Sequence, residues 1–218
     1  MTRLVLASRS PRRTEILRGI GLAHEVLPAD VDETPLAGET PVAHAVRLAR
    51  AKAETIAARV GPDAVVLGAD TTVDLDGTIL GQPVDDEDAR RMLRALSGRA
   101  HRVVTALCVR AGGHAGPVPG GPHAGAGPQA PSSAAPSEGH DVAVVQMRPL
   151  DDELVEWYLR TGEPAGKAGA YAVQGRGAVL VAAVRGAQST VVGLPVALAA
   201  RLLAACGVQG LPRGEGRP

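Results

Sequence analysis

The sequence predicts an α/β fold in which helices flank a mixed sheet, and two observations predict it. Continuous apolar runs that are typical of buried strands, such as residues 3–8 and 64–69, alternate with segments whose apolar residues recur at helical spacing. The chain has 218 residues, of which 45% are hydrophobic and 21% are charged. That is enough to bury a sizeable core in one domain or in two small lobes.

The first half of the chain divides into clear elements. Residues 3–8 form a buried strand, and a helix follows with Ser10 as its cap and Pro11 at its first position. Gly21 ends that helix. A second helix runs from Thr40 to about residue 58, with an apolar stripe along one face. The run 64–69 is typical of a central strand, and we expect it to deliver Asp70, Thr71 and Thr72 at its carboxyl end.

Further elements follow in the middle and at the end of the chain. A hairpin with a primed turn at Asp76 and Gly77 joins residues 73–75 to 78–80. The remaining expected elements are a helix at 86–96, a strand at 101–109 with its partner at 142–147, a helix at 151–161, a glycine-rich loop at 163–177, a strand at 178–184 and a helix at 195–206.

Residues 111–140 differ from their surroundings. They hold eight glycines and six prolines among thirty residues, with no aromatic residue. Such a segment buries too little apolar area to offset its ordering entropy, so we expect a disordered insertion between two strands. The sequence then predicts one domain over residues 1–208 and a flexible tail at 209–218.

Composition excludes several classes of partner. Lys and Arg total 23, as do Asp and Glu, so no global basic field points to nucleic acid or to a membrane surface. Aromatic residues are 1%, which leaves few stacking platforms for single strands. No apolar run reaches the roughly 18 residues of a spanning helix. Arginines interrupt the first apolar run, so we see no signal peptide and expect a cytoplasmic protein.

Two arginines stand in an unfavourable place at the start of the first helix. The first turn carries unsatisfied N–H groups and the positive end of the helix dipole, yet Arg12 and Arg13 lie there. A multiply charged anion over the turn, such as the phosphates of a nucleotide, would explain them. A solvated, mildly unfavourable helix start is the alternative.

Carboxylates provide a second group of candidates. Asp70 follows the central strand, where ligand sites of open α/β sheets lie. Glu33, beside Asp32 in a segment without periodicity, could supply a second carboxylate. Two carboxylates at a cleft suit a divalent cation that also binds phosphate oxygens. The alternatives are a turn cap for Asp70 and an exposed loop for Asp32 and Glu33.

The two lysines and one glutamine complete the candidates. Lys52 and Lys167 are the only lysines, in a chain that otherwise uses arginine for positive charge. Gln174 lies between glycines, and its amide offers both a donor and an acceptor to a nucleobase edge. A surface lysine and an ordinary polar loop residue are the alternatives for Lys52 and Gln174.

Together these motifs resemble the Maf family of nucleoside triphosphate pyrophosphatases. The matching pieces occur in family order over about residues 3–205, apart from 111–140. They are Leu6-Ala7-Ser8-Arg9-Ser10-Pro11-Arg12-Arg13, Asp32-Glu33, Arg47-Leu48-Ala49 with Lys52-Ala53, Gly68-Ala69-Asp70-Thr71, Leu96-Ser97-Gly98, Gly162-Glu163-Pro164, Lys167-Ala168-Gly169-Ala170-Tyr171, Gln174-Gly175 and Val192-Gly193-Leu194-Pro195.

The resemblance implies a fold, an activity and a set of site residues. It implies an elongated, twisted mixed sheet flanked by helices, with two lobes and a central cleft, as in inosine-triphosphatase-like proteins. It implies hydrolysis of dTTP and UTP to the monophosphate and pyrophosphate with a divalent cation, Mg²⁺ or Mn²⁺. The implied roles are catalysis by Asp70, base choice by Arg12, Thr71 and Gln174, phosphate or substrate contacts by Ser8, Arg13, Lys52 and Lys167, and metal binding by Glu33 and Asp70.

The chain also departs from the family pattern. Gln82 stands where Lys is usual, Gly166 where Asp is usual, Val144 where an acid is common, and Gln188 where Tyr is common. These changes favour one alternative, a weakly catalytic nucleotide-binding regulator of septum formation or cell division. A pyrophosphatase for a wider range of modified nucleotides is another. Whether the chain is a monomer or a homodimer stays open.

Overall fold

The computed structural model describes residues 2–113, 137–208 and Gly210. Seven strands form one sheet in the order β2-β1-β3-β5-β6-β7, with β4 also paired to β3. The strands are β1 (Arg3–Leu6), β2 (Glu25–Val26), β3 (Ala64–Leu75), β4 (Thr78–Leu80), β5 (Ala100–Ala111), β6 (Ser137–Met147) and β7 (Val181–Arg185). Strands β1, β2 and β3 run parallel, whereas β4, β5, β6 and β7 join by antiparallel pairing, so the sheet is mixed as predicted.

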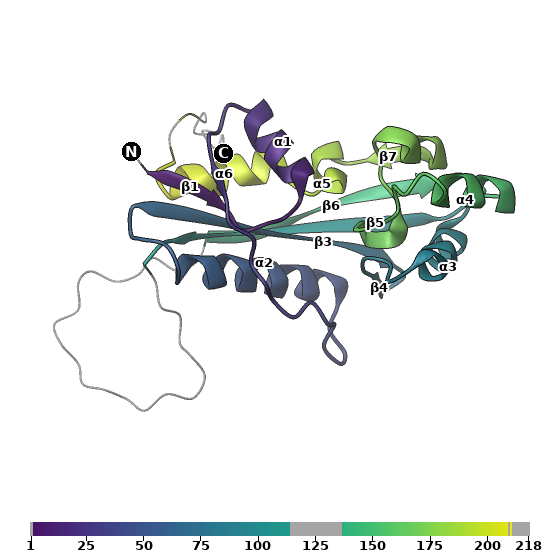
Figure 1. The fold of residues 1–218 in the computed structure, drawn as a ribbon, viewed down its shortest axis with the longest axis horizontal. Coiled ribbons are helices and arrows are strands. Elements are labelled where there is room, and N and C mark those ends of the chain that lie inside the picture. The colour runs from purple at the N-terminus through teal and green to yellow at the C-terminus, as the bar shows by residue number, and fades with distance from the viewer. Residues whose placement is uncertain (1, 114–136, 209, 211–218) are drawn as a thin grey trace, which may run out of the picture.

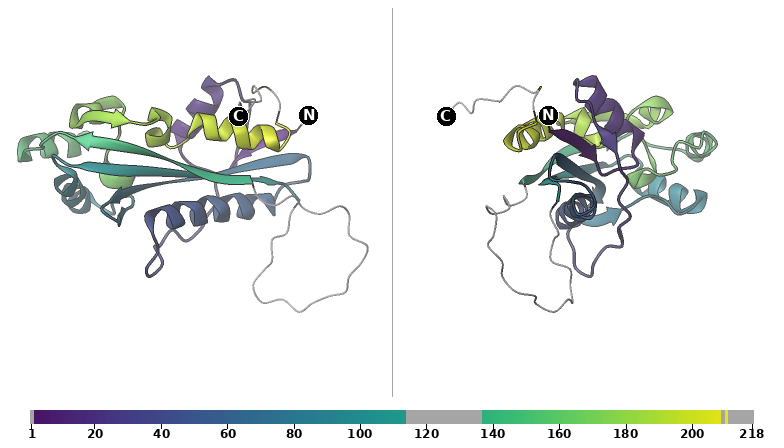
Figure 2. Two further views of the ribbon diagram at one scale, coloured as in Figure 1. Left: turned by 180° about the vertical axis from the view of Figure 1, so that it is seen from behind. Right: turned by 60° about the vertical axis from the view of Figure 1, so that its left-hand side comes forward.

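Helices cover both faces of this elongated sheet. The helices are α1 (Pro11–Gly19), α2 (Pro41–Ala57), α3 (Asp86–Leu96), α4 (Asp152–Leu159), α5 (Gln188–Val192) and α6 (Val196–Ala205), with short 3-10 turns η1 (Ala168–Ala170) and η2 (Gly175–Leu180). Figure 1 shows α2 on one face of the long strands and α1 and α6 on the other. The two views of Figure 2 agree with that arrangement. In the described residues, no helix is both long enough and apolar enough to cross a membrane.

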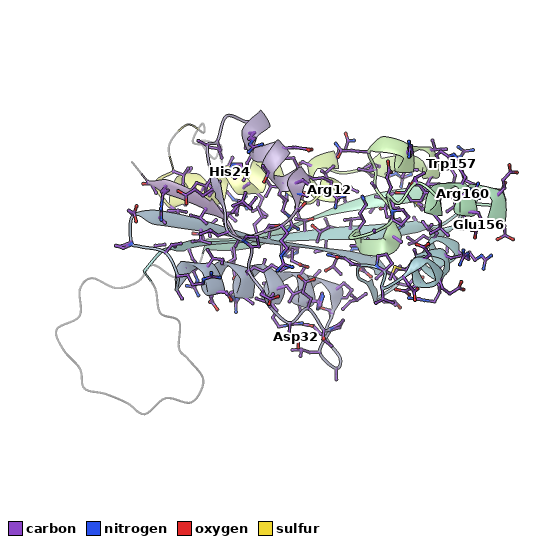
Figure 3. All side chains as sticks on the ribbon, in the orientation of Figure 1. Arg12, His24, Asp32, Glu156, Trp157 and Arg160 are labelled. Carbon is purple, nitrogen blue, oxygen red and sulfur yellow. The ribbon has the colours of Figure 1, made fainter. Side chains whose placement is uncertain are left out.

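The core divides into two lobes along the sheet. In the first lobe, apolar residues of β1, α1, α6 and the first half of β3 pack together, including Leu6, Leu17 and Leu203. In the second lobe, residues of α3, α4 and the second half of β3 pack around Leu93 and Tyr158. Figure 3 places Arg12 between the lobes, whereas Glu156, Trp157 and Arg160 lie at the far end of the second. The predicted two-lobed arrangement is confirmed.

One edge of β3 is open between the lobes. Strand β1 pairs with residues 64–67, and β4 pairs with residues 73–75. Within the described chain, no strand pairs with residues 68–72 along that edge, while β5 pairs with β3 on the other edge throughout. The sequence prediction that a strand ends at residue 69 is therefore wrong, because Asp70, Thr71 and Thr72 lie in the middle of a continuous strand.

Other differences from the sequence prediction are local. The prediction of a single strand over residues 178–184 is wrong, because η2 extends to Leu180 and β7 begins only at Val181. The short helix α5 and the short strand β2 are not predicted by the pattern, since neither is long enough to show periodicity. The hairpin at residues 73–80 is confirmed, with Asp76 and Gly77 both at positive φ as a primed turn requires.

The boundaries of the expected insertion are also corrected. Strand β5 continues to Ala111 and β6 begins at Ser137, so both ends of the 111–140 segment belong to a long antiparallel pair. Val109 and Ser137 are paired in register. The expected disorder of the remaining part, and that of the 209–218 tail, falls on residues 114–136, 209 and 211–218, which lie outside the described residues.

Candidate active site

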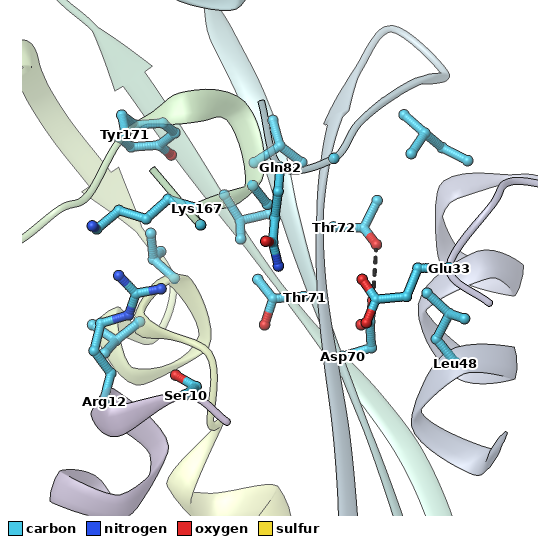
Figure 4. A pocket seen from close by; sticks show the side chains of 18 of the residues that line it. Ser10, Arg12, Glu33, Leu48, Asp70, Thr71, Thr72, Gln82, Lys167 and Tyr171 are labelled. Atoms are coloured by element: carbon cyan, nitrogen blue, oxygen red, sulfur yellow. Dashed lines mark hydrogen bonds between the residues drawn. The ribbon is translucent and has the colours of Figure 1, made fainter. Parts of the chain in front are cut away.

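A pocket of about 510 Å³ lies at the open edge of β3, between the two lobes. Eight of the side chains named from the sequence line it, which brings together residues from six separate segments. Figure 4 labels Arg12, Glu33, Asp70, Thr71 and Lys167 among them. They are Arg12, Arg13, Glu33, Lys52, Asp70, Thr71, Lys167 and Gln174. Ser8 is not among the lining residues, although the resemblance implies a phosphate or substrate contact for it.

One side of the pocket, here called the carboxylate wall, consists of Glu33, Lys52 and Asp70. Lys52 Nζ lies 2.6 Å from Glu33 Oε1 and 2.7 Å from Asp70 Oδ1. Asp70 and Lys52 are buried, at 6% and 8% exposure, whereas the Glu33 side chain is about half exposed. The lysine cation thus offsets part of the charge of two carboxylates and lowers the cost of burying Asp70.

The packing of α2 on β3 explains why Lys52 reaches Asp70. A Cβ atom at Gly68 would lie 2.2 Å from the carbonyl oxygen of Ala49 and 2.7 Å from the nitrogen of Ala53. Only glycine therefore allows the helix to approach the strand so closely at this point. Lys52 lies on α2 between those two contacts, directly over the strand. Thr72, two residues after Asp70 and on the same face, donates to Asp70 Oδ2 at 3.3 Å.

Arg13 is held by three neutral acceptors rather than by a carboxylate. Its Nε donates to the carbonyl of Gly193 at 2.8 Å, its Nη1 to Ser8 Oγ at 2.8 Å, and its Nη2 to Thr71 Oγ1 at 3.0 Å. Burial lowers the pKa of this guanidinium, and the charge of nearby Asp70 opposes that effect. Ser8 therefore contacts Arg13, and the guanidinium keeps two N–H groups that these bonds do not use.

The opposite side of the pocket, here called the cation wall, consists of Arg12 and Lys167. Figure 4 shows the guanidinium of Arg12 near the amine of Lys167, across Thr71 from Asp70. In the described part of the chain, Arg12 Nε is buried without a hydrogen-bond partner, and Lys167 Nζ donates to the carbonyl of Glu163. Burial, followed by the charge of Arg12, lowers the pKa of Lys167. Two like charges at a pocket wall make this wall attractive to an anion.

Several lining residues are absent from the sequence-based candidates. Ser10 occupies the cap position of α1, but its side chain makes no capping bond, so the predicted cap is wrong in its hydrogen bond. Ser10 lines the pocket instead, as do Thr72, Gln82 and Tyr171. These residues lie in the sequence motifs or beside candidates, but the sequence assigns them no role in the site, because only the fold shows that they line the pocket.

Of the four positions that depart from the family pattern, two line the pocket and two do not. Gln82 and Gly166 both line the pocket, and a Cβ atom at Gly166 would lie 3.9 Å from Gln82 Oε1. Val144 lies on β6 and Gln188 begins α5, and neither is among the lining residues. The first pair therefore bears on the pocket directly.

Glu33 and Asp70 could serve a divalent cation only together with other ligands. Among the described residues, no group of three or more His, Cys, Asp or Glu side chains is placed to hold a metal ion. Mg²⁺, however, is commonly bound by one or two carboxylates together with substrate phosphates and water. The two carboxylates, both within reach of Lys52 Nζ, fit a cation that arrives with a polyphosphate.

Curated relatives match almost the whole chain. A protein of Anaeromyxobacter dehalogenans (strain 2CP-C) named dTTP/UTP pyrophosphatase is 48% identical over 207 residues, covering 94% of each chain. Proteins of the same name from Aromatoleum aromaticum and Symbiobacterium thermophilum are 42% and 38% identical, covering 94% and 99% of this chain and 96% and 100% of theirs.

Among solved structures, the similarity is weaker. A HAM1 protein from Coxiella burnetii shares 19% identity with a TM-score of 0.43, over 67% of this chain and 73% of that one. Similarity of that extent carries no argument about the fold, which rests on the strand order above. The family model of the Maf-like proteins matches residues 3–206. With that match, and with relatives at 38–48% identity over nearly its full length, the chain belongs to the Maf-like protein family.

Proposed function

We propose that this protein is a nucleoside triphosphate pyrophosphatase that hydrolyses dTTP and UTP to the monophosphate and pyrophosphate. One observation carries the proposal: a single pocket places a buried carboxylate, Asp70, opposite two cations that form no ion pair within the described residues. The names of the relatives support the choice of nucleotide.

Asp70 is the residue to which we assign proton transfer. Its Oδ1 is held by Lys52 and its Oδ2 accepts from Thr72, so the carboxylate has a fixed orientation at the pocket. In the proposed step, a water oxygen attacks the α-phosphorus while Asp70 accepts a proton from that water. The bond from the α-phosphorus to the bridging oxygen breaks, and pyrophosphate leaves with the electron pair of that bond.

The cation wall suits the leaving group. Negative charge develops on the bridging oxygen and on the β- and γ-phosphates as the bond breaks, and positioned cations stabilise such charge in a water-poor site. Neither Arg12 nor Lys167 forms an ion pair in the described chain, so a polyphosphate would add counter-charge to that of the more distant Glu15 and Glu163. Arg13, with its two unused N–H groups, would add a third contact.

Glu33 and Asp70 would hold a divalent cation, Mg²⁺ or Mn²⁺. Bound there with the nucleotide, such an ion would neutralise phosphate oxygens and polarise the α-phosphate. Lys52 already lies between the same two carboxylates, so a cation entering the site would share its ligands with the lysine.

A nucleotide panel tests the proposal and its alternatives. The purified chain is incubated with dTTP, UTP, dCTP, CTP, ATP and GTP, with Mg²⁺, with Mn²⁺ or with a chelator, and pyrophosphate release is measured. We expect release that is fastest with dTTP and UTP and that stops with the chelator. Binding without release would favour a regulator of cell division, and release without preference would favour a wider nucleotide range.

Base choice, location and assembly complete the proposal. We assign base selection to Thr71 and Gln174, with Arg12 as a third candidate, because all three line the pocket. Nucleoside triphosphates are cytoplasmic substrates, so we propose a cytoplasmic protein; cell fractionation would check this. Light scattering of the purified chain would decide between a monomer and a homodimer.

A further inference from the structure

Hydrogen bonds connect a hydroxyl group in the pocket to a buried hydroxyl and a backbone carbonyl behind it. Thr71 on β3 and Thr105 on β5 are paired in register, and their Oγ1 atoms lie 2.9 Å apart. Thr105 is fully buried and donates its hydroxyl proton to the carbonyl of Thr190 at 2.7 Å. Thr190 is also fully buried and donates its own hydroxyl proton to Asp141.

The direction of these bonds fixes the proton of Thr71. A threonine hydroxyl has one proton and two lone pairs. Because Thr105 donates its only proton to Thr190, it accepts the hydrogen bond from Thr71. Arg13 Nη2 donates to Thr71 Oγ1 at 3.0 Å and occupies one lone pair. Thr71, which is partly exposed and lines the pocket, therefore presents a single lone pair to any ligand there.

A lone pair of this kind selects its partner by chemistry. It repels the oxygens of a phosphate and accepts only from an N–H or O–H group. Uracil and thymine carry a donor at N3, whereas the N3 of cytosine is an acceptor. An acceptor-only hydroxyl at that position would therefore favour the first two bases and disfavour the third.

We propose that Thr105 is a positioning residue for base selection, because it commits the proton of Thr71 and leaves Thr71 able only to accept the N3–H of uracil or thymine. The inference rests on the proposed function and deepens it. It adds Thr105, which is not among the residues that line the pocket, to the residues that determine which nucleotide is accepted.

Replacement of Thr105 tests the proposal on the protein side. Thr105→Val keeps the shape of the side chain but frees the proton of Thr71, which then donates to cytosine. We expect the ratio of kcat/KM for UTP to that for CTP to fall about tenfold, while Thr105→Ser retains the wild-type ratio. An equal loss for both nucleotides would show that Thr105 serves only stability and would overturn the proposal.

A substrate-side test needs no variant and separates this inference from the proposed activity. Calorimetric titration of the wild-type chain with non-hydrolysable α,β-methylene-UTP, its N3-methyl derivative and α,β-methylene-CTP measures binding alone. We expect the unmodified UTP analogue to bind about tenfold more tightly than the other two. That result without pyrophosphate release from UTP would reject the activity and keep the inference. Release from UTP combined with equal binding of all three would do the reverse.

Discussion

The two lysines of the chain lie on opposite walls of one pocket, in opposite electrostatic situations. Lys52 contacts two carboxylates at 2.6 and 2.7 Å, so its charge is balanced within the protein. Lys167 contacts a backbone carbonyl and faces the charge of Arg12, which lowers its pKa in addition to the effect of burial. The comparison teaches that Lys52 has its ion-pair partners before a ligand binds, whereas Lys167 forms no ion pair within the described residues. Nearby Glu163 offsets part of its charge, and an anionic ligand would add further counter-charge.

The largest expected effect is a loss of pyrophosphate release when Asp70 of the carboxylate wall is replaced. Asp70→Asn keeps the size of the side chain but removes the proton acceptor, so we expect pyrophosphate release to fall roughly 10³-fold. Nucleotide binding should persist, because the cation wall is untouched. Release is measured at saturating UTP, and binding by titration. A variant that retains a near wild-type rate would show that Asp70 is not the base.

The next largest effect is a pH dependence of stability that arises from His101, which contacts Tyr171 in the segment after Lys167. His101 Nε2 lies 2.7 Å from the hydroxyl of Tyr171, and burial lowers the pKa of His101 to about 4. The unfolded chain takes up this proton near pH 6.5, so the folded state gains stability from the neutral ring above that pH and loses it as the pH falls toward 4.

Urea unfolding at pH 7 and pH 5 measures this effect. We expect the folded state to lose about 2 kcal/mol more in the wild type than in His101→Gln, which keeps a partner for Tyr171 but does not titrate. Equal losses in the two chains would show that His101 is not held neutral in the folded state.

Substitutions in the cation wall should weaken the affinity of the protein for pyrophosphate. Lys167→Gln and Arg12→Gln each remove one of two facing charges, and we expect each to weaken pyrophosphate inhibition about tenfold. Because the two side chains bind one anion, the double variant should lose less than the product of the single losses. Arg9→Gln, at an exposed position three residues before Arg12 and not among the lining residues, is the matched control and should change little. Unchanged inhibition in all variants would contradict the difference between the walls.

The smallest effect is expected far from either wall. Residues 114–136 connect the ends of β5 and β6, where Val109 pairs with Ser137, and the described residues that line the pocket belong to other segments. Replacement of residues 114–136 by a short Gly/Ser linker should leave kcat and KM for UTP within about twofold, because hairpin ends of this kind tolerate changes of length. A larger loss would reveal a contribution to the site.

The sequence predicts regular elements better than it predicts the long strand at the site. The helices at 40–58 and 86–96 were predicted because their apolar faces meet the core in the expected way. Strand β3 was predicted to stop at residue 69, because Asp70, Thr71 and Thr72 are polar. Lys52 satisfies Asp70, and Arg13 and Thr105 satisfy Thr71, all from other elements. A local pattern carries no information about such contacts.

In the candidate site, too, some residues could be predicted from the sequence, whereas others are brought in only by tertiary contacts. The dipole argument for an anion near Arg12 and Arg13 agrees with their place at the pocket, as do the residue-type arguments for Asp70, Glu33, Lys52, Lys167 and Gln174, while the family resemblance added Thr71. The hydrogen bonds from Arg13 to Ser8 and to the carbonyl of Gly193 could not be predicted. The second of them joins residues 180 positions apart in the sequence. Thr105 enters only through its register opposite Thr71, which the fold alone determines.

Strands β3 and β5 each contain twelve residues and are paired over the whole interval from Val65 to Asp74, so the same two strands pass through both lobes. The lobes are therefore joined by continuous paired strands and not by a flexible hinge. A hinge opening of the two lobes would break backbone hydrogen bonds between β3 and β5 near Asp70. Adjustment to a ligand must come from the loops that carry Glu33 and Lys167, so the enzyme should admit its substrate by moving small parts around a fixed frame.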